Sequence, residues 1–512
     1  MRKVLLFFFC ISAASMLLYE NCAASDWTFM VYLDADNNLE AEGIDDFLEM
    51  ASVGSDSNTK VVVQFDRIPG YDNTNGDWQE CQRFLVSQSM TPTVENAVPD
   101  WGDGLGGREV NMADPQTLID FVKWAMDQYP ADNYALVFWN HGGGWRNERG
   151  ADRQIRKSVC WDDTSEFDAL HMSEVKEALS TINDEGDLLD LVGFDACLMG
   201  MIEVAYDIRD LAHVMVASEE SEPDDGWPYE TILADLVNVP TMTPLELGAT
   251  IVDRYGETYP VWDYTTQSAI DLNMVEALAT AINDFAAAIM DADKSGIAAA
   301  RSAAQEYDYP EHIDLYHFSE LLSAETSATA VANAAYDVML ALEQAVTAEY
   351  HGYQSPNSHG LAIYFPEIQS SFDSDYTGST IDFPGETQWD DFLHWYYGTT
   401  MEVILLAPDD GTVLSASIPA VFEWNASPDY RFKIQFSPSA LFVKGFPTLS
   451  IPRQRWMRDA TTTAIPELIW QNTWNRLQII EQKNGIVYWR VLGKTGLSAP
   501  PVISEVRSFT IE

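Results

Sequence analysis

Short apolar runs of strand length alternate with helical segments through the first half of the chain. A strand with one face in water alternates polar and apolar residues, whereas an unbroken apolar run predicts a strand that is buried on both faces. Such runs occupy 27–33, 60–65, 134–140, 188–196 and 214–218, with helices predicted at about 39–50, 115–129, 173–183 and 201–211. This order predicts an α/β/α sandwich around a mainly parallel sheet.

Residues 244–400 have a mostly helical pattern. Helices are predicted near 244–258, 274–291, 327–349 and 387–397, with two strand-like pieces at 267–272 and 360–365. We expect this helical extension to cover and complete the sheet. The stretch 67–113 is rich in Gly, Asp, Asn and Pro and is expected to form hairpins or loops.

The region after residue 400 differs in pattern and in charge. Asp and Glu number 69 against 15 Lys and Arg in 26–400, but 10 against 11 in 401–512. Short alternating segments follow at 402–406, 420–424, 431–436, 476–480, 486–492 and 506–511. We therefore predict an N-terminal segment at 1–25, an α/β domain at 26–400 and an all-β sandwich of immunoglobulin or fibronectin type at 401–512.

The N-terminal segment has the features of a secretory signal peptide. Arg2 and Lys3 precede the apolar run 4–18, and small residues follow at 23–25. The run is too short for a membrane-spanning helix, and we expect no membrane span elsewhere. Lipidation at Cys22 is the less favoured alternative. The expected location is secreted, periplasmic or at the cell surface.

The formal net charge of −52 limits the partners of the protein. So acidic a surface repels nucleic acid and anionic membranes. It serves solubility or, as an alternative, the attraction of basic substrates. Clustered carboxylates also suit calcium, although no Asp-x-Asp-x-Asp-Gly loop is present. We expect that no cofactor is required, with calcium as an open alternative.

Three cysteines follow the signal segment: Cys81, Cys160 and Cys197. In an oxidising compartment an odd number leaves one thiol over, and a bridge between Cys81 and Cys160 would leave Cys197 unpaired. Cys197 directly follows the run 188–196, and His141 directly follows the run 134–140. Parallel sheets bind ligands outside the carboxyl ends of their strands, so we expect the two side chains to face each other there.

A cysteine nucleophile needs an imidazole nearby and N–H donors for the developing oxyanion. His141 would supply the imidazole, and the backbone N–H groups of Gly142 and Cys197 are the predicted oxyanion donors. The alternative is an ordinary turn histidine and a buried core cysteine. The occurrence of both at equivalent strand ends favours catalysis.

Four motifs resemble the clostripain family of cysteine peptidases. They are Trp27-Thr-Phe-Met-Val-Tyr-Leu-Asp-Ala-Asp-Asn-Asn-Leu39, Trp139-Asn-His-Gly-Gly-Gly-Trp145, Asp162-Asp-Thr164 and Phe194-Asp-Ala-Cys-Leu-Met-Gly200. The resemblance runs from about 26 to 397. It implies a caspase-like fold, a catalytic dyad of His141 and Cys197, and cleavage of proteins or peptides after Arg or Lys.

The resemblance also implies acidic residues in the pocket that receives the side chain before the scissile bond. One matches Asp195, and a second should lie near 222–227, where Asp225 is favoured and Asp224 is its rival. The family further implies a zymogen that is cleaved between the dyad residues. The processing candidates are Arg146, Arg149, Arg153, Arg156 and Lys157. A solvated loop paired with the acidic surface is the alternative.

The sequence therefore predicts a secreted cysteine endopeptidase that acts through a thioester acyl-enzyme. One alternative is a catalytically silent protein that binds a surface or partner on the same fold. Another is a glycosidase that uses paired carboxylates.

Overall fold

The computed structural model describes residues 24–99, 108–146, 159–183, 188–261, 263–290, 293–373, 375–376 and 381–398, and parts of 404–511. An eight-stranded sheet in the order β11-β9-β8-β7-β4-β1-β2-β3 forms its centre. The strands are β1 (Ser25–Ala35), β2 (Thr59–Arg67), β3 (Gln82–Leu85), β4 (Ala131–Trp139), β7 (Leu189–Asp195), β8 (Ala212–Ala217), β9 (Thr266–Asp271) and β11 (Val346–His351).

The five strands that the apolar runs predict are the parallel core of this sheet. β1 pairs in parallel with β2 and β4, and β7 pairs in parallel with β4 and β8. The antiparallel edge strands β3 and β11 were not predicted, since 67–113 was interpreted as hairpins or loops and 346–349 as the end of a helix. β11 is half-buried and polar at several positions, so it lacks the apolar run of a central strand.

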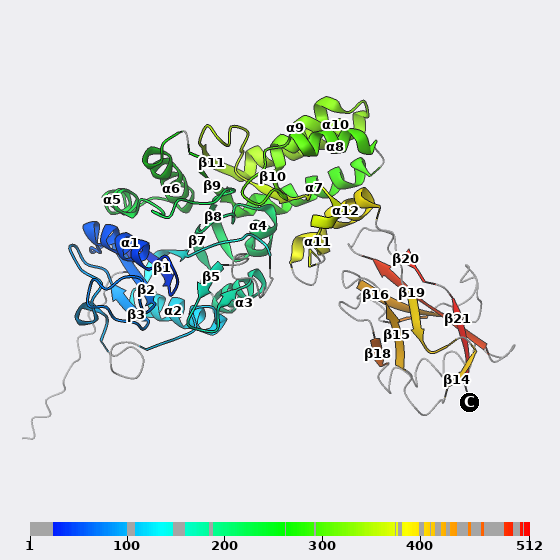
Figure 1. Cartoon of the computed structure of the whole chain (residues 1–512), viewed down its shortest axis with the longest axis horizontal. Helices are drawn as coiled ribbons and strands as arrows, with labels where there is room; N and C mark the ends of the chain where they lie inside the picture. The colour runs from blue at the N-terminus through cyan, green and yellow to red at the C-terminus, as the bar shows by residue number, and fades with distance from the viewer. Residues whose placement is uncertain are drawn as a thin grey trace, which may run out of the picture.

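Helices cover both faces of the sheet, as predicted (Figure 1). One core cluster joins the sheet to α2 (Pro115–Gln128), α3 (Met172–Asn183), α4 (Ile202–Ile208) and α7 (Val275–Ile289). The other joins it to α1 (Glu40–Val53), α5 (Tyr229–Asn238) and α6 (Pro244–Thr258). Asp114 caps α2 by accepting a hydrogen bond from the Gln116 N–H at 2.9 Å, and Pro115 opens the helix. The fold is an α/β/α sandwich.

The helical extension completes this sandwich. It contributes β9 and β11 to the sheet and adds α8 (Lys294–Ala303), α9 (Leu315–Glu325), α10 (Thr329–Ala345), α11 (Asp382–Glu386) and α12 (Trp389–Tyr397), with the small pair β10 (His312–Asp314) and β12 (Ala362–Tyr364). One described stretch, Leu272–Ile289, is long and apolar enough by composition to cross a membrane. It carries Glu276 and Asp284, and the apolar face of its helix α7 lies in the core, as is usual for the central helix of a folded domain.

A hairpin near the end of β1 was not predicted. β5 (Val159–Asp162) and β6 (Asp168–Leu170) pair in antiparallel fashion within the segment interpreted as a charged loop. The Asp163 N–H donates to the Asp36 carbonyl at 2.8 Å, which holds the hairpin against the residues that follow β1. The motif at 162–164 is thereby placed next to the motif at 27–39.

The described strands after residue 403 form two further sheets, in the orders β13-β15-β18 and β14-β21-β19-β16-β17, with β20 beside β19. Their bounds are β13 (Ile404–Ala407), β14 (Thr412–Leu414), β15 (Val421–Asn425), β16 (Arg431–Ser437), β17 (Leu449–Ile451), β18 (Thr462–Ala464), β19 (Ile486–Lys494), β20 (Val502–Ile503) and β21 (Arg507–Ile511). Five of the six predicted strands match β13, β15, β16, β19 and β21, and the sixth, at 476–480, lies outside the described residues. The buried aromatics Phe422, Trp424, Phe436 and Trp489 fill the core between the two sheets.

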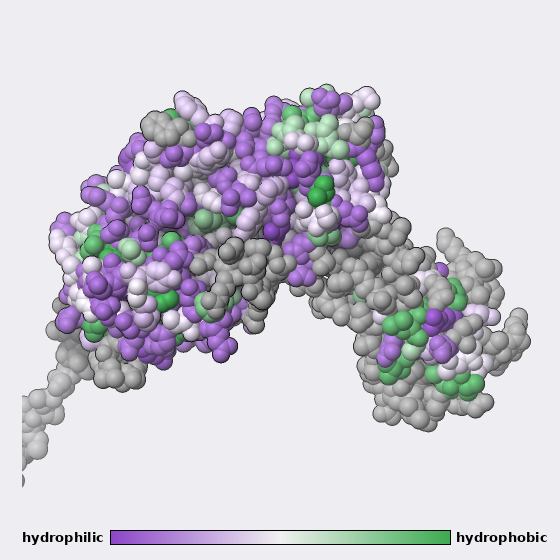
Figure 2. Space-filling model, viewed as in Figure 1, coloured by the Kyte–Doolittle hydropathy of each residue, from purple (hydrophilic) through white to green (hydrophobic). Residues whose placement is uncertain are grey.

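The visible surface of the α/β region is mostly polar (Figure 2). This agrees with its 69 acidic residues against 15 basic ones. Hydrophobic side chains are scattered over it in small groups, as is normal for a folded domain.

Candidate active site

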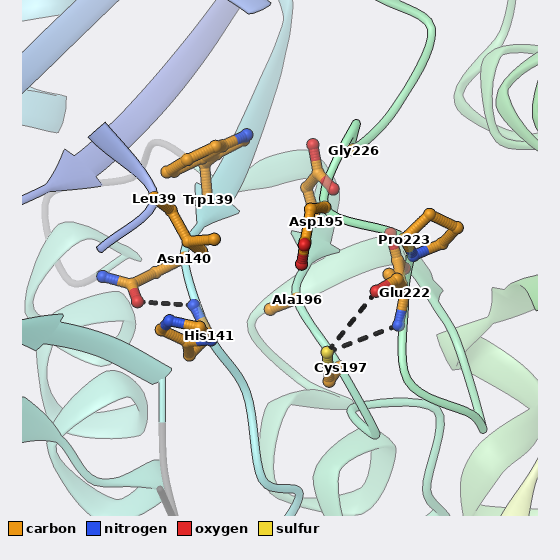
Figure 3. A pocket seen from close by; sticks show the side chains of 11 residues that line it. Leu39, Trp139, Asn140, His141, Asp195, Ala196, Cys197, Glu222, Pro223 and Gly226 are labelled. Atoms are coloured by element: carbon orange, nitrogen blue, oxygen red, sulfur yellow. Dashed lines mark hydrogen bonds between the residues drawn. The ribbon is translucent and has the colours of Figure 1, made fainter. Parts of the chain in front are cut away.

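His141 and Cys197 lie at the ends of neighbouring strands, as predicted. β4 and β7 pair in parallel with Trp139 opposite Asp195, so His141 and Cys197 both stand two residues beyond the last pair. The Asn140 N–H donates to the Asp195 carbonyl at 3.2 Å, which extends the pairing to the turn. Both side chains line one small pocket (Figure 3).

The turn after β4 approaches the Cys197 backbone closely. A Cβ atom at Gly142 would stand 2.3 Å from the Cys197 carbonyl oxygen and 3.0 Å from its nitrogen, so only glycine fits without a shift. The two backbone segments that carry the predicted oxyanion donors are therefore neighbours.

Asn38 contacts the imidazole of His141, and the sequence reasoning missed it. The His141 Nε2 atom lies 3.1 Å from the Asn38 Oδ1 atom. The Asn140 Oδ1 atom accepts from the His141 backbone N–H, and Asn140 Nδ2 donates to the Asp34 carbonyl at 2.8 Å. Asn38 lies just after β1, at the end of the motif 27–39. Because β1 and β4 are neighbouring parallel strands, a residue that follows β1 could have been expected close to His141, which follows β4.

The Cys197 thiol is held by the loop that follows β8. Its Sγ atom accepts from the Glu222 N–H at 3.3 Å and lies 3.9 Å from the Glu222 carbonyl oxygen (Figure 3). Burial raises the pKa of Cys197 to about 11, and the negative charges of Glu222 and Asp224 add to this shift. The thiol is therefore protonated at neutral pH and needs a base to become a nucleophile.

Asp195 and Glu222 line the pocket beside Cys197, and Asp46 lies close to Asp195; we call these three residues the pocket carboxylates. Asp195 is 5% exposed and accepts from the Tyr229 hydroxyl at 2.8 Å and from the Trp227 N–H at 3.1 Å. Burial raises the pKa of Asp195 to about 6. Burial, then the charge of Asp195, raises the pKa values of Asp46 and Glu222 well above their ordinary range.

Sequence reasoning found Asp195 but neither Asp46 nor Glu222. Asp46 lies on α1, far from the site in sequence, and its Oδ2 atom accepts from the Trp139 indole N–H at 2.6 Å. Only the packing of α1 on the sheet brings it to the end of β4. Glu222 begins the 222–227 loop that was singled out, yet the loop conformation decides which acidic side chain turns inward.

Gly226 separates two cavities. A Cβ atom there would stand 2.8 Å from Asp46 Oδ2 and 3.1 Å from Asp195 Oδ2, and its φ of +60° also favours glycine. The cavity beside Cys197 measures about 30 Å³ and is lined by the exposed Asp224. The second measures about 750 Å³ and is lined by the exposed Asp225. The two rivals for the second acidic contact thus lie in different cavities.

Two expectations change. Cys81 and Cys160 are buried free thiols rather than a bridge, because each packs in the apolar core and Cys81 lies 3.9 Å from the Met112 sulfur. Arg146 was grouped with the accessible basic loop, but it is 6% exposed and forms an ion pair with Glu311. Cleavage after Arg146 would first require that pair to open. The other four processing candidates lie outside the described residues.

Comparisons with known proteins show the family of the chain. The model of the clostripain family matches residues 31–396. Clostripain of Hathewaya histolytica is 28% identical over 414 residues, which cover 69% of this chain and 77% of that protein.

Two solved structures are similar to this chain, and the first of them supports the fold. A secreted C11 cysteine protease from Bacteroides thetaiotaomicron, solved with an irreversible peptide inhibitor, is 20% identical with a TM-score of 0.53, and the match covers 70% of this chain and 98% of that one. An inactive zymogen C11 protease from Parabacteroides distasonis is 20% identical with a TM-score of 0.49, over 67% and 92% of the two chains. Since the family model spans most of the sequence, the chain belongs to the clostripain family and is a cysteine endopeptidase.

Proposed function

We propose that this endopeptidase cleaves proteins or peptides after Arg or Lys, with Cys197 as nucleophile and His141 as its base. The observation that carries the proposal is the group of pocket carboxylates, of which Asp195 and Glu222 line the cavity beside Cys197. A buried carboxylate is stabilised by a hydrogen-bonded cation, and a guanidinium or ammonium group on the substrate is such a partner. The family implies the dyad, and the proposal is supported by the fact that His141 and Cys197 line one pocket.

The reaction follows from these groups. His141 removes the proton from the Cys197 thiol as sulfur attacks the substrate carbonyl carbon, and the N–H groups of Gly142 and Cys197 bind the resulting oxyanion. The imidazolium then protonates the leaving amine, which departs as the C–N bond breaks and a thioester forms. Water attacks the thioester with His141 as base, which releases the acid and restores the thiol.

The wider cavity supports a preference for basic peptides. Its lining is strongly acidic and includes Glu42, Asp45, Asp46, Glu49, Asp225, Glu230 and Asp263. The negative electrostatic potential of so many carboxylates attracts cationic substrates and raises their local concentration. If the basic side chain of the substrate enters the small cavity, Asp224 is the second acidic contact; if it enters the larger cavity, Asp225 is. We favour Asp225, on the larger cavity.

The small cavity beside Cys197 supports a latent form that is activated by cleavage. At about 30 Å³ it is too small for an arginine side chain, so substrate entry requires the loop at 222–226 to move. We propose that cleavage after one of the basic residues between 146 and 157 releases this loop. Export through the N-terminal signal peptide would place the enzyme outside the cytoplasm.

A peptide pair tests the proposed function. A fluorogenic peptide with Arg before the cleaved bond is compared with its citrulline analogue, which has nearly the same shape but no charge. The native chain should turn over the Arg peptide, and Cys197→Ala should not. Turnover of the citrulline peptide at an equal rate would contradict the specificity, and no turnover of any peptide by the processed native chain would favour a silent binding protein. Activity that survives Cys197→Ala would favour carboxylate chemistry.

A further inference from the structure

Two buried side chains follow the turn 141–144 and fasten it to the helical extension. Trp145 is 0% exposed, and its ring centroid lies 5.1 Å from that of Tyr364. Arg146 is 6% exposed and forms an ion pair with Glu311, a residue 165 positions away. The chain therefore passes from the turn that carries His141 directly into a long-range contact.

The Arg146 guanidinium lies among aromatic rings. Its Cζ atom is 5.4 Å from the ring centroid of Tyr309, 5.7 Å from that of Tyr364 and 5.9 Å from that of Trp145. Ring faces attract a cation, and they do so most strongly where water is excluded. Glu311 supplies the counter-charge that a buried guanidinium needs. We call Arg146 and these partners the arginine anchor.

The imidazole of His312 lies beside the anchor. It is 0% exposed, and its ring meets that of Tyr309 edge to face at 5.6 Å. Neither ring nitrogen of His312 has a hydrogen-bond partner among the described residues. Burial, then the charge of Arg146, lowers the pKa of His312 well below its ordinary range. His312 is therefore neutral at physiological pH and leaves the negative charge of Glu311 to Arg146.

The turn between His141 and the anchor runs closely past the residues that follow Cys197. A Cβ atom at Gly144 would stand 2.6 Å from the Met201 sulfur and 3.1 Å from the Leu198 carbonyl oxygen. At Gly142 it would stand 2.3 Å from the Cys197 carbonyl oxygen. Because the two segments are in such close contact, a shift of the downstream end of the turn would move Gly142 relative to Cys197.

The small strand pair β10 and β12 holds both segments. Glu311 directly precedes β10, and β12, which carries Tyr364, pairs with β10 in antiparallel fashion. The Ala362 N–H in β12 donates to the Gly200 carbonyl at 2.8 Å. The anchor thus fixes the turn after β4 to the same strand pair that fixes the segment after Cys197.

We propose that Arg146 is a positioning residue for the peptidase reaction: its ion pair with Glu311 holds the Gly142 N–H where the oxyanion forms, a role that rests on the proposed function of that N–H. An oxyanion donor acts only within hydrogen-bond distance of the oxygen, and a displacement of about 1 Å costs up to about 100-fold in rate. Cleavage in the interval 149–157 would cut the covalent connection from the turn to β5. The anchor would then hold the downstream end of the turn in the processed enzyme.

The test compares Arg146→Met, Glu311→Gln and the double variant with the native chain. All are processed in trans by a small amount of tagged native enzyme, which is then removed. The matched control is Arg209→Met at the end of α4, because Arg209 also lies over a ring, that of Tyr206 at 3.7 Å, and pairs with Glu276 at 3.1 Å.

Three readouts separate the oxyanion from the thiol. The first is kcat and KM for the Arg peptide. The second is inhibition by a peptide aldehyde with Arg at its end, which adds to the Cys197 thiol to form a hemithioacetal whose oxygen occupies the oxyanion position. The third is the rate at which iodoacetamide alkylates Cys197, a reaction that needs the thiolate but no oxyanion donor.

Arg146→Met should lower kcat about 10- to 100-fold with little change in KM, and weaken aldehyde inhibition by a similar factor. The alkylation rate should stay near that of the native chain. Glu311→Gln should act in the same direction, and the double variant should be no worse than Arg146→Met, because the pair is already broken. Arg209→Met should match the native chain in all three readouts.

Glu311→Gln keeps the shape of the side chain, so it decides the matter if Arg146→Met does not fold. Native values of kcat and aldehyde inhibition in Glu311→Gln, an equal fall in the alkylation rate, or losses that add in the double variant would each overturn the role of Arg146. No turnover by the native chain would instead overturn the proposed function, and this role with it.

Discussion

Two groups of carboxyl residues lie at the carboxyl edge of the sheet and differ in their surroundings. One group is the pocket carboxylates. The other, which we call the cation cluster, consists of Asp36, Asp66, Glu109 and Asp162, and one oxygen from each lies within 4.8 Å of the others. Both groups are largely buried, and burial raises the pKa values in both.

In the pocket, Asp195 is already satisfied by the Tyr229 hydroxyl and the Trp227 N–H, and it lies next to a cavity and a thiol. In the cluster, Asp36 Oδ1 and Asp66 Oδ2 are buried and accept no hydrogen bond from any described residue.

This difference separates two kinds of cation. A side-chain cation arrives with its own chain and needs an opening beside the nucleophile, which Gly226 keeps by having no side chain. A bare ion needs several oxygens within bonding distance of one point, which the cluster provides. Calcium, if the chain takes it up, would therefore bind at the cluster. Access and the separation of donors, rather than acidity, decide which cation each group would take.

The largest expected effect comes from Cys197→Ala. It removes the attacking sulfur and should lower turnover of the Arg peptide by at least about 10⁴-fold. Because Cys197 is not part of the cation cluster, the response of the thermal midpoint to calcium should equal that of the native chain. A variant that changed both properties would show that the two regions are not independent.

Asp195→Asn should discriminate between charged and neutral substrates. Loss of one charge-assisted hydrogen bond costs about 1.5–3 kcal/mol, so kcat/KM for the Arg peptide should fall by about 10- to 150-fold. The citrulline peptide and the calcium response serve as controls and should change little. An equal loss for both peptides would assign Asp195 a purely structural role.

The cation cluster predicts that stability depends on pH in the calcium-free chain. The folded-state pKa of Asp36 is raised to about 7, above its unfolded value, so the native state binds the extra proton. Stability is then greatest below about pH 4 for this group and is lost as the pH rises through about 7, by about 1.4 kcal/mol per unit of pKa difference before solvent screening. Thermal midpoints should therefore fall from about pH 5 to about pH 8, and saturating calcium should reduce the fall. If the thermal midpoint fell equally with pH in the presence and absence of calcium, Asp36 would not be a ligand of the ion.

Asn38→Ala should have the smallest effect, because Asn38 orients the imidazole and is neither the nucleophile nor the base. A several-fold loss of kcat, of the order expected for one neutral hydrogen bond of about 1 kcal/mol, should come with a shifted pH profile. Asn38→Asp, which keeps an oxygen acceptor, should restore much of the rate. A change in KM alone would contradict a positioning role.

The sequence by itself determined the parallel strands of the sheet and their ends. Unbroken apolar runs identify strands buried on both faces, and the order of strands and helices fixes their parallel direction, so His141 and Cys197 could be placed at one edge. The edge strand β11 could not be predicted, because a half-buried strand lacks that run. The predicted bridge between Cys81 and Cys160 is wrong, because the number of cysteines does not report the distance between their side chains.

Only the tertiary structure decided which distant residues meet at that edge. Asp46 reaches the pocket from α1, and Asp66, Glu109 and Asp162 meet Asp36 from three other segments. A local pattern encodes burial and chain direction because these depend on neighbours in sequence. Contacts between segments depend on how helices and hairpins pack on the sheet, and no spacing along the chain reports that packing.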